Sequence, residues 1–384
     1  MNQIDSKINR LPSMVEGDGA RQDPSPSSVM ELTFATTRGE PRRVVVCERV
    51  GRGAMADVYS GELDDGARVA VKVARLEGER SSIKERFCRE AQLVCRLSHP
   101  NIVSGIGCGT MPGRSRAPFV VLEYLCGGSL LDQMRARRAI DPALALGIAE
   151  QIARALAYLH LDGRIAAHRD IKPANILFDA DGVPKLSDLG VAKTRMVVSE
   201  DFATKVAGTL RYMSPEQLAD CSKVDIRSDI YSLGIVLYEM LTGASPWKLD
   251  GKNPIRLSSE LPSLSKSATA RAALAPFELD ALDELLQRAC APEPFERFQT
   301  PDTFAQAAAV LARDLAEGGI ALSHPAVRFK RRRPRAAAIA ATASTALLAV
   351  ALLANSGQAA TERSSISTEV PPVGREIQLS DPSP

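Results

Sequence analysis

The sequence predicts an α+β fold in which a small β-rich lobe is followed by a larger helical lobe. Three short valine-rich runs, at residues 44–46, 58–59 and 69–73, have the composition of β-strands. Residues 143–160 then place leucine and isoleucine at spacings of three and four, which is the pattern of an amphipathic helix. The strand patterns precede this helical pattern along the chain, and their order predicts the two lobes.

Composition limits the classes of protein to which the chain could belong. Its 384 residues are enough for one large domain or two ordinary ones. The formal net charge is only +2, which disfavours a polyanion-binding surface and predicts no nucleic-acid partner. The seven cysteines form no clusters with metal-ligand spacing, which argues against a zinc site or a disulfide framework. We therefore expect reduced, mostly buried thiols in a cytosolic domain.

The N-terminal segment, residues 1–40, is predicted to be a disordered arm. It is rich in Ser, Pro, Asp and Gly and shows no periodic pattern of apolar residues. A recruitment or phosphoacceptor arm is the functional alternative. The segment also lacks the apolar run of a cleavable signal peptide.

A glycine-rich turn lies between the first two predicted strands. Gly51 and Gly53 would let backbone amides approach phosphate oxygens closely, because neither carries a side chain. A plain hairpin is the alternative for this turn taken by itself. The next predicted strand carries Lys72 in the run Val-Ala-Val-Lys. A lysine that binds phosphate at this place would support a nucleotide-binding turn rather than a plain hairpin.

A helix is predicted to begin at residues 82–85, whose sequence Ser-Ile-Lys-Glu has the form of a capping box. Glu90 falls beside the apolar face of this helix, where an unpaired carboxylate would be costly. A salt bridge to Lys72 would remove that cost. The alternative is a solvent-facing Glu90 paired with Arg86 or Arg89, and spacing alone does not decide between them.

Residues 168–175, with the sequence His-Arg-Asp-Ile-Lys-Pro-Ala-Asn, predict a tight polar loop that carries chemistry. Asp170 could accept the proton of an attacking hydroxyl. Asn175 and Asp188 offer two oxygen ligands of different kinds, which suit Mg²⁺ shared with phosphate. By itself an Asp-x-Lys sequence is usually a solvated turn, so the interpretation depends on the order of the other segments.

In this order the segments resemble the eukaryotic-type (Hanks-type) serine/threonine protein kinases of the bacterial membrane-anchored kind. Residues 168–175 are similar to the family's H-R-D-x-K-x-x-N, and residues 188–190, Asp-Leu-Gly, are similar to its D-F-G. Residues 208–216, Gly-Thr-Leu-Arg-Tyr-Met-Ser-Pro-Glu, are similar to the family's G-T-x-x-Y-M-A-P-E. The resemblance covers residues 44–315 and implies a bilobal protein kinase domain that binds ATP and protein substrates.

The resemblance also implies a role for each polar residue. Asp170 would be the catalytic base and Lys172 would steady the γ-phosphate, while Asn175 and Asp188 would hold Mg²⁺ or Mn²⁺. Transfer would go from ATP to serine or threonine hydroxyls, as Lys172 and Asn175 are similar to the Ser/Thr branch. The other residues expected at the nucleotide are Val50, Gly51, Arg52, Gly53, Ala54, Val58, Ala70, Lys72, Glu90, Glu123, Leu125 and Leu177, with Leu122 as gatekeeper.

Four residues have implied structural roles. Asp229 would hold the backbone of the catalytic loop, and Arg297 would be the buried partner of Glu216. Arg169 is a ready partner for a phosphate on the segment before residue 216. This predicts autophosphorylation, with a homodimer as the arrangement for transfer in trans, at the acceptor candidates Thr204 and Thr209.

The sequence departs from the family pattern at three positions. Ala56 replaces the third glycine of the loop, Leu189 replaces the phenylalanine after Asp188, and Ser214 replaces an alanine. Because no catalytic position is lost, a pseudokinase or membrane scaffold is the less favoured alternative. A small-molecule phosphotransferase is disfavoured by the segment 208–216, which binds peptide in the family.

The C-terminal region predicts a single transmembrane helix. Residues 336–354 carry no charge, and as a helix they would span about 28 Å, close to the thickness of a bilayer core. A basic linker, residues 316–335, precedes them and predicts that the catalytic domain stays on the cytoplasmic side of the plasma membrane. Residues 355–384 are expected to be a short disordered extracytoplasmic tail. An alanine-rich soluble helix, or a basic patch for nucleic acid, is the alternative.

Overall fold

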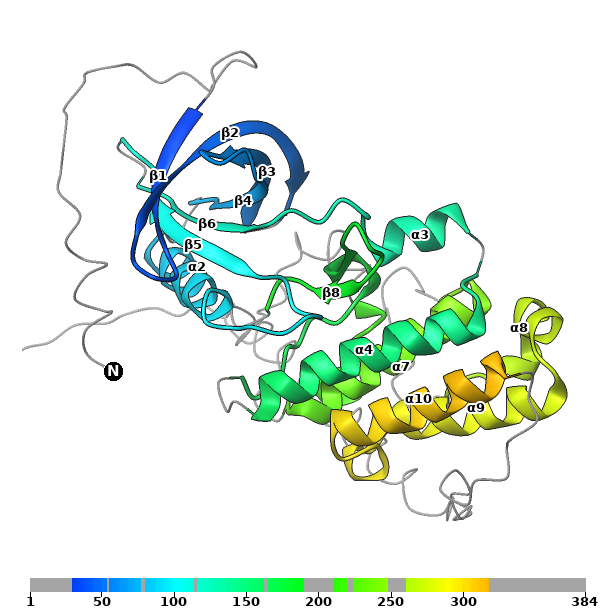
Figure 1. Ribbon diagram of the computed structural model, residues 1–384. Helices are drawn as coiled ribbons and strands as arrows, with labels where there is room; N and C mark the ends of the chain where they lie inside the picture. The colour runs from blue at the N-terminus through cyan, green and yellow to red at the C-terminus, as the bar shows by residue number, and fades with distance from the viewer. Residues whose placement is uncertain are drawn as a thin grey trace, which may run out of the picture. The chain divides into compact units, whose positions relative to one another are not determined.

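The computed structural model describes most of the region from residue 30 to residue 317. The described ranges are 30–53, 55–76, 80–113, 116–137, 139–161, 165–189, 210–219, 224–247 and 260–317. Within them, six strands and one helix form a small lobe, and helices with one short sheet form a larger lobe (Figure 1). The predicted α+β architecture with a β-rich lobe before a helical one is confirmed.

The small lobe is a closed antiparallel barrel. Its strands are arranged in the order β1-β2-β3-β4-β6-β5. Their bounds are β1 Met30–Thr36, β2 Pro41–Arg52, β3 Ala56–Leu63, β4 Arg68–Ala74, β5 Gly105–Thr110 and β6 Pro118–Glu123. Strand β1 closes the barrel by pairing with β5 as well as β2, with Ala35 opposite Cys108. The interior is filled by Leu32, Phe34, Val44, Val46, Leu63, Val69, Val71, Phe119 and Val121.

The prediction that residues 1–40 are disordered is wrong for the part that the structure describes. Met30–Thr36 is a strand, because Leu32 and Phe34 alternate with neighbours that face outward and both lie buried in the barrel. This period of two extends over only a few residues, and the polar composition of the flanking chain obscures it. Residues 1–29 lie outside the described part of the chain.

Helix α2, Arg80–Val94, packs against strands β4, β5 and β6. Phe87, Ala91 and Val94 recur at spacings of four and three, and all three are buried. The helix is therefore held by one apolar face, which also carries Glu90 toward the barrel.

The helical lobe is built around α4 and α7. The larger helices are α3 Leu130–Ala136, α4 Pro142–Leu161, α7 Ile226–Thr242, α9 Pro276–Ala289 and α10 Pro301–Ala316, with the short α6 Pro215–Ala219 and α8 Ala268–Ala273. Short 3-10 turns occur at Pro173–Asn175, Leu264–Lys266 and Pro294–Glu296. Helix α7 begins at the N-cap Asp225 and ends at Gly243, whose φ of 72° favours glycine.

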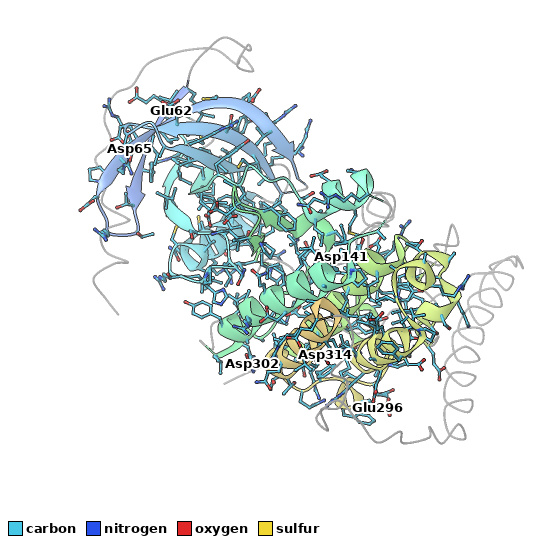
Figure 2. The ribbon with its side chains drawn as sticks, turned by 45° about the vertical axis from the view of Figure 1, so that its right-hand side comes forward. Glu62, Asp65, Asp141, Glu296, Asp302 and Asp314 are labelled. Carbon is cyan, nitrogen blue, oxygen red and sulfur yellow. The ribbon has the colours of Figure 1, made fainter. Side chains whose placement is uncertain are left out.

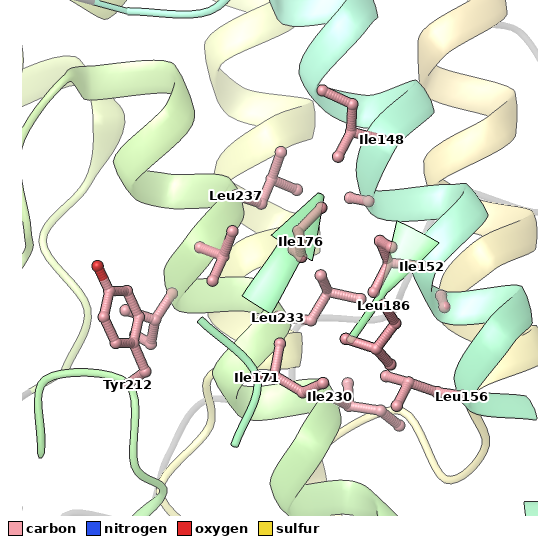
Figure 3. Packing of buried hydrophobic residues seen from close by; sticks show 14 of the residues in the cluster. Ile148, Ile152, Leu156, Ile171, Ile176, Leu186, Tyr212, Ile230, Leu233 and Leu237 are labelled. Carbon is pink, nitrogen blue, oxygen red and sulfur yellow. The ribbon is translucent and has the colours of Figure 1, made fainter. Parts of the chain in front are cut away.

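A two-stranded sheet, β7 Ile176–Phe178 and β8 Pro184–Leu186, lies against these helices. Ile176 and Leu186 are fully buried between α4 and α7 (Figure 3). Burying each such side chain contributes about 1.5–3 kcal/mol. The loops on either side of β7 and β8 carry the predicted catalytic and metal-binding residues, so this packing positions them. Figure 2 shows labelled acidic side chains on both lobes, from Glu62 on the barrel to Asp302 on α10.

The sequence also predicts a transmembrane helix near the C-terminal end of the chain. Among the described helices none is both long enough and apolar enough to cross a bilayer. The predicted span 336–354, its tail 355–384 and nearly all of the linker 316–335 lie outside the described residues.

The structure describes six cysteines, all of them free, and only Cys290 is buried. The expectation of mostly buried thiols is therefore wrong for these residues.

Candidate active site

Lys72 joins three segments that are far apart in the sequence. Its Nζ atom lies 2.8 Å from Oε1 of Glu90 on α2 and 2.8 Å from Oδ1 of Asp188 after β8. Lys72 sits inside the sheet, opposite Val58 on β3 and Val120 on β6, so its backbone is fixed on both sides. Helical spacing alone does not decide the partner of Glu90. The structure shows that this partner is Lys72.

The charges of this cluster are mutually dependent. Burial by itself would lower the pKa of Lys72, but Asp188 and Glu90 outweigh it and raise the pKa above its usual range. Burial raises the pKa of Glu90, and Lys72 opposes that rise. The positive charge of Lys72 lowers the pKa of Asp188. Lys72 is thus a fixed cation beside an ionised Asp188 at neutral pH.

Asp188 is placed by an unusual backbone conformation. Its φ is 56°, a region that few residues other than glycine adopt. The neighbouring Ser187 donates from its backbone N at 2.9 Å and from its Oγ at 3.1 Å to the carbonyl of Asn175. These bonds tie the segment of Asp188 to the loop of Asn175. The side chain of Asp188 is 52% exposed, so it faces open space as well as Lys72.

Asp170 lies at the centre of the polar loop and is 8% exposed. Its Oδ2 accepts from Nζ of Lys172 at 3.0 Å and from Nδ2 of Asn175 at 2.9 Å. Nδ2 of Asn175 also donates to the backbone carbonyl of Asp170 at 2.9 Å. The structure therefore brings together the predicted base, the predicted phosphate-binding lysine and one predicted metal ligand.

The backbone of this loop is held from α7. The carboxylate of Asp229 accepts from the amides of His168 at 2.6 Å and Arg169 at 2.8 Å. Arg169 has a φ of 66°, so the loop keeps a strained turn at this point. Burial raises the pKa of Asp229 to about 7, against the opposing effect of the two amides. The contacts are those expected of Asp229 from the sequence.

The residues predicted to bind a metal ion fit that task. Because Nδ2 of Asn175 is directed at Asp170, its Oδ1 lies on the opposite side of the amide. The segment of Asp188 is bonded to the backbone of Asn175, as described above, and one carboxylate oxygen of Asp188 is not bonded to Lys72. Carboxylate and amide oxygens of this kind suit Mg²⁺, which completes its shell with phosphate and water.

The glycine-rich turn closes the hairpin of β2 and β3. Gly51 pairs with Val58 and Arg52 with Asp57, and the amide of Gly53 donates to the carbonyl of Ala56 at 2.8 Å. Val50 is 47% exposed at the edge of this hairpin. Ala54, the remaining predicted residue of the turn, lies outside the described residues.

A small pocket opens beside Lys72. Its lining includes Lys72, Glu90 and Asp188, together with Leu122, the predicted gatekeeper, and Leu189. The other predicted contacts of the nucleotide base do not line this pocket. Val58, Ala70 and Leu177 are half-buried on β3, β4 and β7, and Ala70 lies opposite Leu122 in the sheet.

Glu123, which is expected at the nucleotide, ends β6 and is bonded to Ser104 through both its backbone and its side chain. The amide of Glu123 donates to the carbonyl of Ser104 at 3.1 Å, so that N–H group is already engaged. The Glu123 carboxylate accepts from the amide of Ser104 at 2.7 Å and from Nζ of Lys185 at 3.0 Å. Sequence reasoning missed Lys185, because 62 residues separate it from Glu123 and no local pattern links them. Leu125, which follows, is half-buried.

Glu216 and Arg297 form a buried ion pair in the helical lobe. Two guanidinium nitrogens of Arg297 lie 2.6 and 2.8 Å from the two carboxylate oxygens of Glu216. Arg297 is 1% exposed and donates further to the carbonyls of Ala291 and Pro292. The predicted pair is present, and it ties α6 to the turn before α10. Thr204 and Thr209, the predicted phosphoacceptors, lie outside the described residues.

The chain is similar to proteins of one family. The family model described as the protein kinase domain matches residues 44–307. The chain is 34% identical over 260 residues to the probable serine/threonine-protein kinase CPE1738 of Clostridium perfringens, covering 67% of this chain and 36% of that protein. It is 35% identical over 264 residues to the serine/threonine-protein kinase PrkC of Bacillus subtilis, covering 68% of this chain and 39% of that protein.

The similarity extends to solved structures. The fold resembles that of the PknI kinase domain of Mycobacterium tuberculosis with a TM-score of 0.54 and 26% identity, covering 73% of this chain and 98% of that chain. The chain spans well under half the length of the two relatives named above, so it is similar to only one part of each.

Proposed function

The chain belongs to the protein kinase domain family, and from that premise we propose that it is a serine/threonine protein kinase. It would transfer the γ-phosphoryl group of ATP to hydroxyl groups of proteins. The observation that carries the proposal is the convergence of Lys72, Glu90 and Asp188 within 2.8 Å contacts, beside the loop of Asp170. These groups come from three separate elements, and their meeting supports a phosphate site.

Each residue of the site has a separable task. Lys72, held by Glu90, binds the α- and β-phosphates through a charge that persists at all working pH values. Asp170 accepts the proton of the substrate hydroxyl as that oxygen attacks the γ-phosphorus and the bond to ADP breaks. Lys172, 3.0 Å from Asp170, neutralises charge on the γ-phosphate. Catalysis of this kind depends mainly on positioning and on charge stabilisation.

Asn175 and Asp188 are the residues that would hold Mg²⁺. When bound, the ion neutralises charge on the phosphate oxygens. The two residues supply one amide and one carboxylate oxygen, and their loops are bonded to each other through Ser187. Mn²⁺, which favours similar oxygen ligands, would serve as a substitute.

The acceptor class can be tested directly. Wild-type protein is incubated with Mg²⁺, γ-labelled ATP and either a mixed protein substrate or small hydroxylated acceptors such as choline and aminoglycosides. We expect label on protein, and acid hydrolysis should release phosphoserine and phosphothreonine. Label only on the small acceptors, or only on tyrosine, would contradict the proposal.

We also propose that the protein autophosphorylates on the segment before residue 216, at Thr204 or Thr209, through a transient homodimer, as part of signal transduction. Arg169 supports this proposal because it precedes Asp170 and its carbonyl accepts from Gln217 of α6, near the end of that segment. Mass spectrometry of active protein should find phosphate at one of the two threonines. Fully active protein with both threonines unmodified would contradict the proposal.

Finally, we propose that residues 336–354 span the plasma membrane once and leave the catalytic domain in the cytoplasm. The uncharged run and the basic residues before it support this topology. Reporter fusions after Pro384 test it. A reporter that is active only outside the cytoplasm is expected, whereas cytoplasmic activity at that position would reject the span.

A further inference from the structure

Three half-buried cysteines gather where α2 packs against β5. Cys88 lies within α2 and Cys95 directly follows its last residue. They are seven residues apart, about two helical turns, so both lie on the same side of the helix. The amide of Cys95 donates to the carbonyl of Ala91 at 3.2 Å, which continues the helical pattern to Cys95. Cys108 lies on β5, a strand that contacts α2.

The backbone of β5 approaches Cys95 very closely. A side chain at Gly105 would place its first carbon 2.7 Å from the backbone nitrogen of Cys95 and 2.9 Å from its sulfur. Real side-chain carbons do not come so near, so glycine is required at this point. Cys108, three residues further along β5, packs on the core that α2 shares. The thiols of Cys95 and Cys108 contact each other across this junction.

The contact makes the two sulfur atoms chemically unequal. A hydrogen bond from the Cys95 thiol lowers the pKa of Cys108 to about 7, against the effect of burial. The same bond raises the pKa of Cys95. Burial raises the pKa of the third thiol, Cys88. Cys108 is therefore the more acidic thiol of the pair, and the thiolate is the reactive form of a cysteine.

We propose that Cys108 and Cys95 are a redox-active dithiol, which hydrogen peroxide converts into a disulfide between β5 and the end of α2. The Cys108 thiolate attacks one peroxide oxygen and becomes a sulfenic acid, while the other oxygen leaves as water after protonation. The Cys95 thiol then attacks the Cys108 sulfur, the S–O bond breaks and a second water leaves. Overall, two thiols are oxidised and one peroxide is reduced to two waters.

The disulfide would constrain an element that positions the phosphate site. Cys95 follows Glu90 by five residues, so the new bond fixes the end of the helix that holds Lys72. Closing the loop between residues 95 and 108 also restricts the unfolded chain, and this raises thermal stability. The dithiol chemistry does not depend on the proposed phosphotransferase activity, since its readouts are chemical.

The first experiment maps the oxidised bonds in the full-length protein. Protein is treated with hydrogen peroxide, free thiols are alkylated and the peptides are analysed by mass spectrometry without reduction. We expect one linked species that joins the Cys95 and Cys108 peptides and that disappears in Cys108→Ser. It should persist in the matched controls Cys47→Ser and Cys126→Ser, which change exposed thiols. Alkylated Cys95 and Cys108 beside oxidised exposed thiols, or a Cys88–Cys108 link, would overturn the proposal.

The second experiment tests the unequal thiols. The rate of alkylation of Cys108 is followed against pH by peptide mass spectrometry in wild type and in Cys95→Ala. The midpoint of the wild-type profile should lie near pH 7 and should move upward when the Cys95 thiol is removed. The control Cys88→Ala should leave the midpoint in place. An unchanged midpoint in Cys95→Ala, or an equal shift in Cys88→Ala, would reject the pairing.

Discussion

Nζ of Lys72 lies 2.8 Å from Oε1 of Glu90, so strand β4 of the barrel is bonded to α2 across 18 residues of sequence. Both side chains are largely buried, with 15% and 14% of their surfaces exposed. A carboxylate in this position orients the lysine instead of leaving it to sample many rotamers. The position of α2 thus fixes the position of the Lys72 ammonium group, which we propose binds phosphate oxygens.

The first prediction concerns this contact. Glu90→Gln keeps the shape of the side chain but removes the charge that holds Lys72. A hydrogen bond to a charged group contributes about 1.5–3 kcal/mol, so kcat/KM should fall about tenfold to a hundredfold. The control is Glu85→Gln, an exposed position on the same helix, which should leave kcat/KM unchanged. Equal kcat/KM values for Glu90→Gln and wild type would show that the contact has no part in the reaction.

The second prediction concerns the support of the polar loop by α7. Asp229→Ala removes the acceptor of two backbone amides, those of His168 and Arg169. Each unsatisfied donor costs about 1–3 kcal/mol, and the strained turn at Arg169 should relax. Urea unfolding should therefore show a lower free energy of unfolding, and kcat should fall with it. Asp229→Asn, which retains one acceptor, should lie between Asp229→Ala and wild type; equal stability of all three proteins would contradict the assignment.

The third prediction concerns the buried pair of the helical lobe. Arg297→Ala leaves the carboxylate of Glu216 buried without its partner, which typically costs about 3–5 kcal/mol. The matched control is Arg227→Ala, which breaks the more exposed pair with Asp225 and should cost less than about 1 kcal/mol. For both variants the loss in the free energy of unfolding is measured by urea unfolding. Similar small losses in the two variants would mean that Arg297 does not hold the lobe together.

The fourth prediction is the pH dependence of stability at the same pair. Burial would raise the pKa of Glu216, but hydrogen bonds from Arg297 and Ser228 outweigh it, and the pKa lies below its usual value. A lowered pKa in the folded state means that the stabilisation is present above the ordinary pKa of glutamate and is lost as pH falls through the folded value. Glu216→Gln should therefore flatten the acid limb of a stability profile below about pH 4.5. If the acid limb of Glu216→Gln is as steep as that of wild type, protonation of Glu216 does not cause the loss of stability in acid.

Much of the site could be predicted from local sequence. The residues of the polar loop lie within eight positions of one another, and the valine-rich run around Lys72 predicts a strand. The helical spacing around Glu90 places it on the apolar side of α2. The two ion pairs are a different case. Spacing leaves the pair of Lys72 with Glu90 undecided, and only the family resemblance implies it and the pair of Glu216 with Arg297, which are 81 residues apart; both pairs are present.

Other features depend on contacts between distant segments. Strand β1 closes the barrel only because β5 offers it an edge, and a run of seven residues in a polar region gives no sign of that partner. The bond between Lys185 and Glu123 joins β8 of the helical lobe to β6 of the small lobe, and the two residues are 62 positions apart. The contact of Cys95 with Cys108 likewise depends on the close approach permitted at Gly105.

The most direct test of the proposed phosphotransferase compares wild type with Asp170→Asn in a radiolabelled ATP assay, with nucleotide binding measured on the same samples. Loss of the catalytic base should lower the rate of phosphate transfer by about 10²–10⁴-fold. Lys72 should still bind the phosphates of ATP, and Asp188 should still bind Mg²⁺. We therefore expect unchanged nucleotide affinity with almost no labelled protein. Wild-type rates in the Asp170→Asn variant would contradict the account.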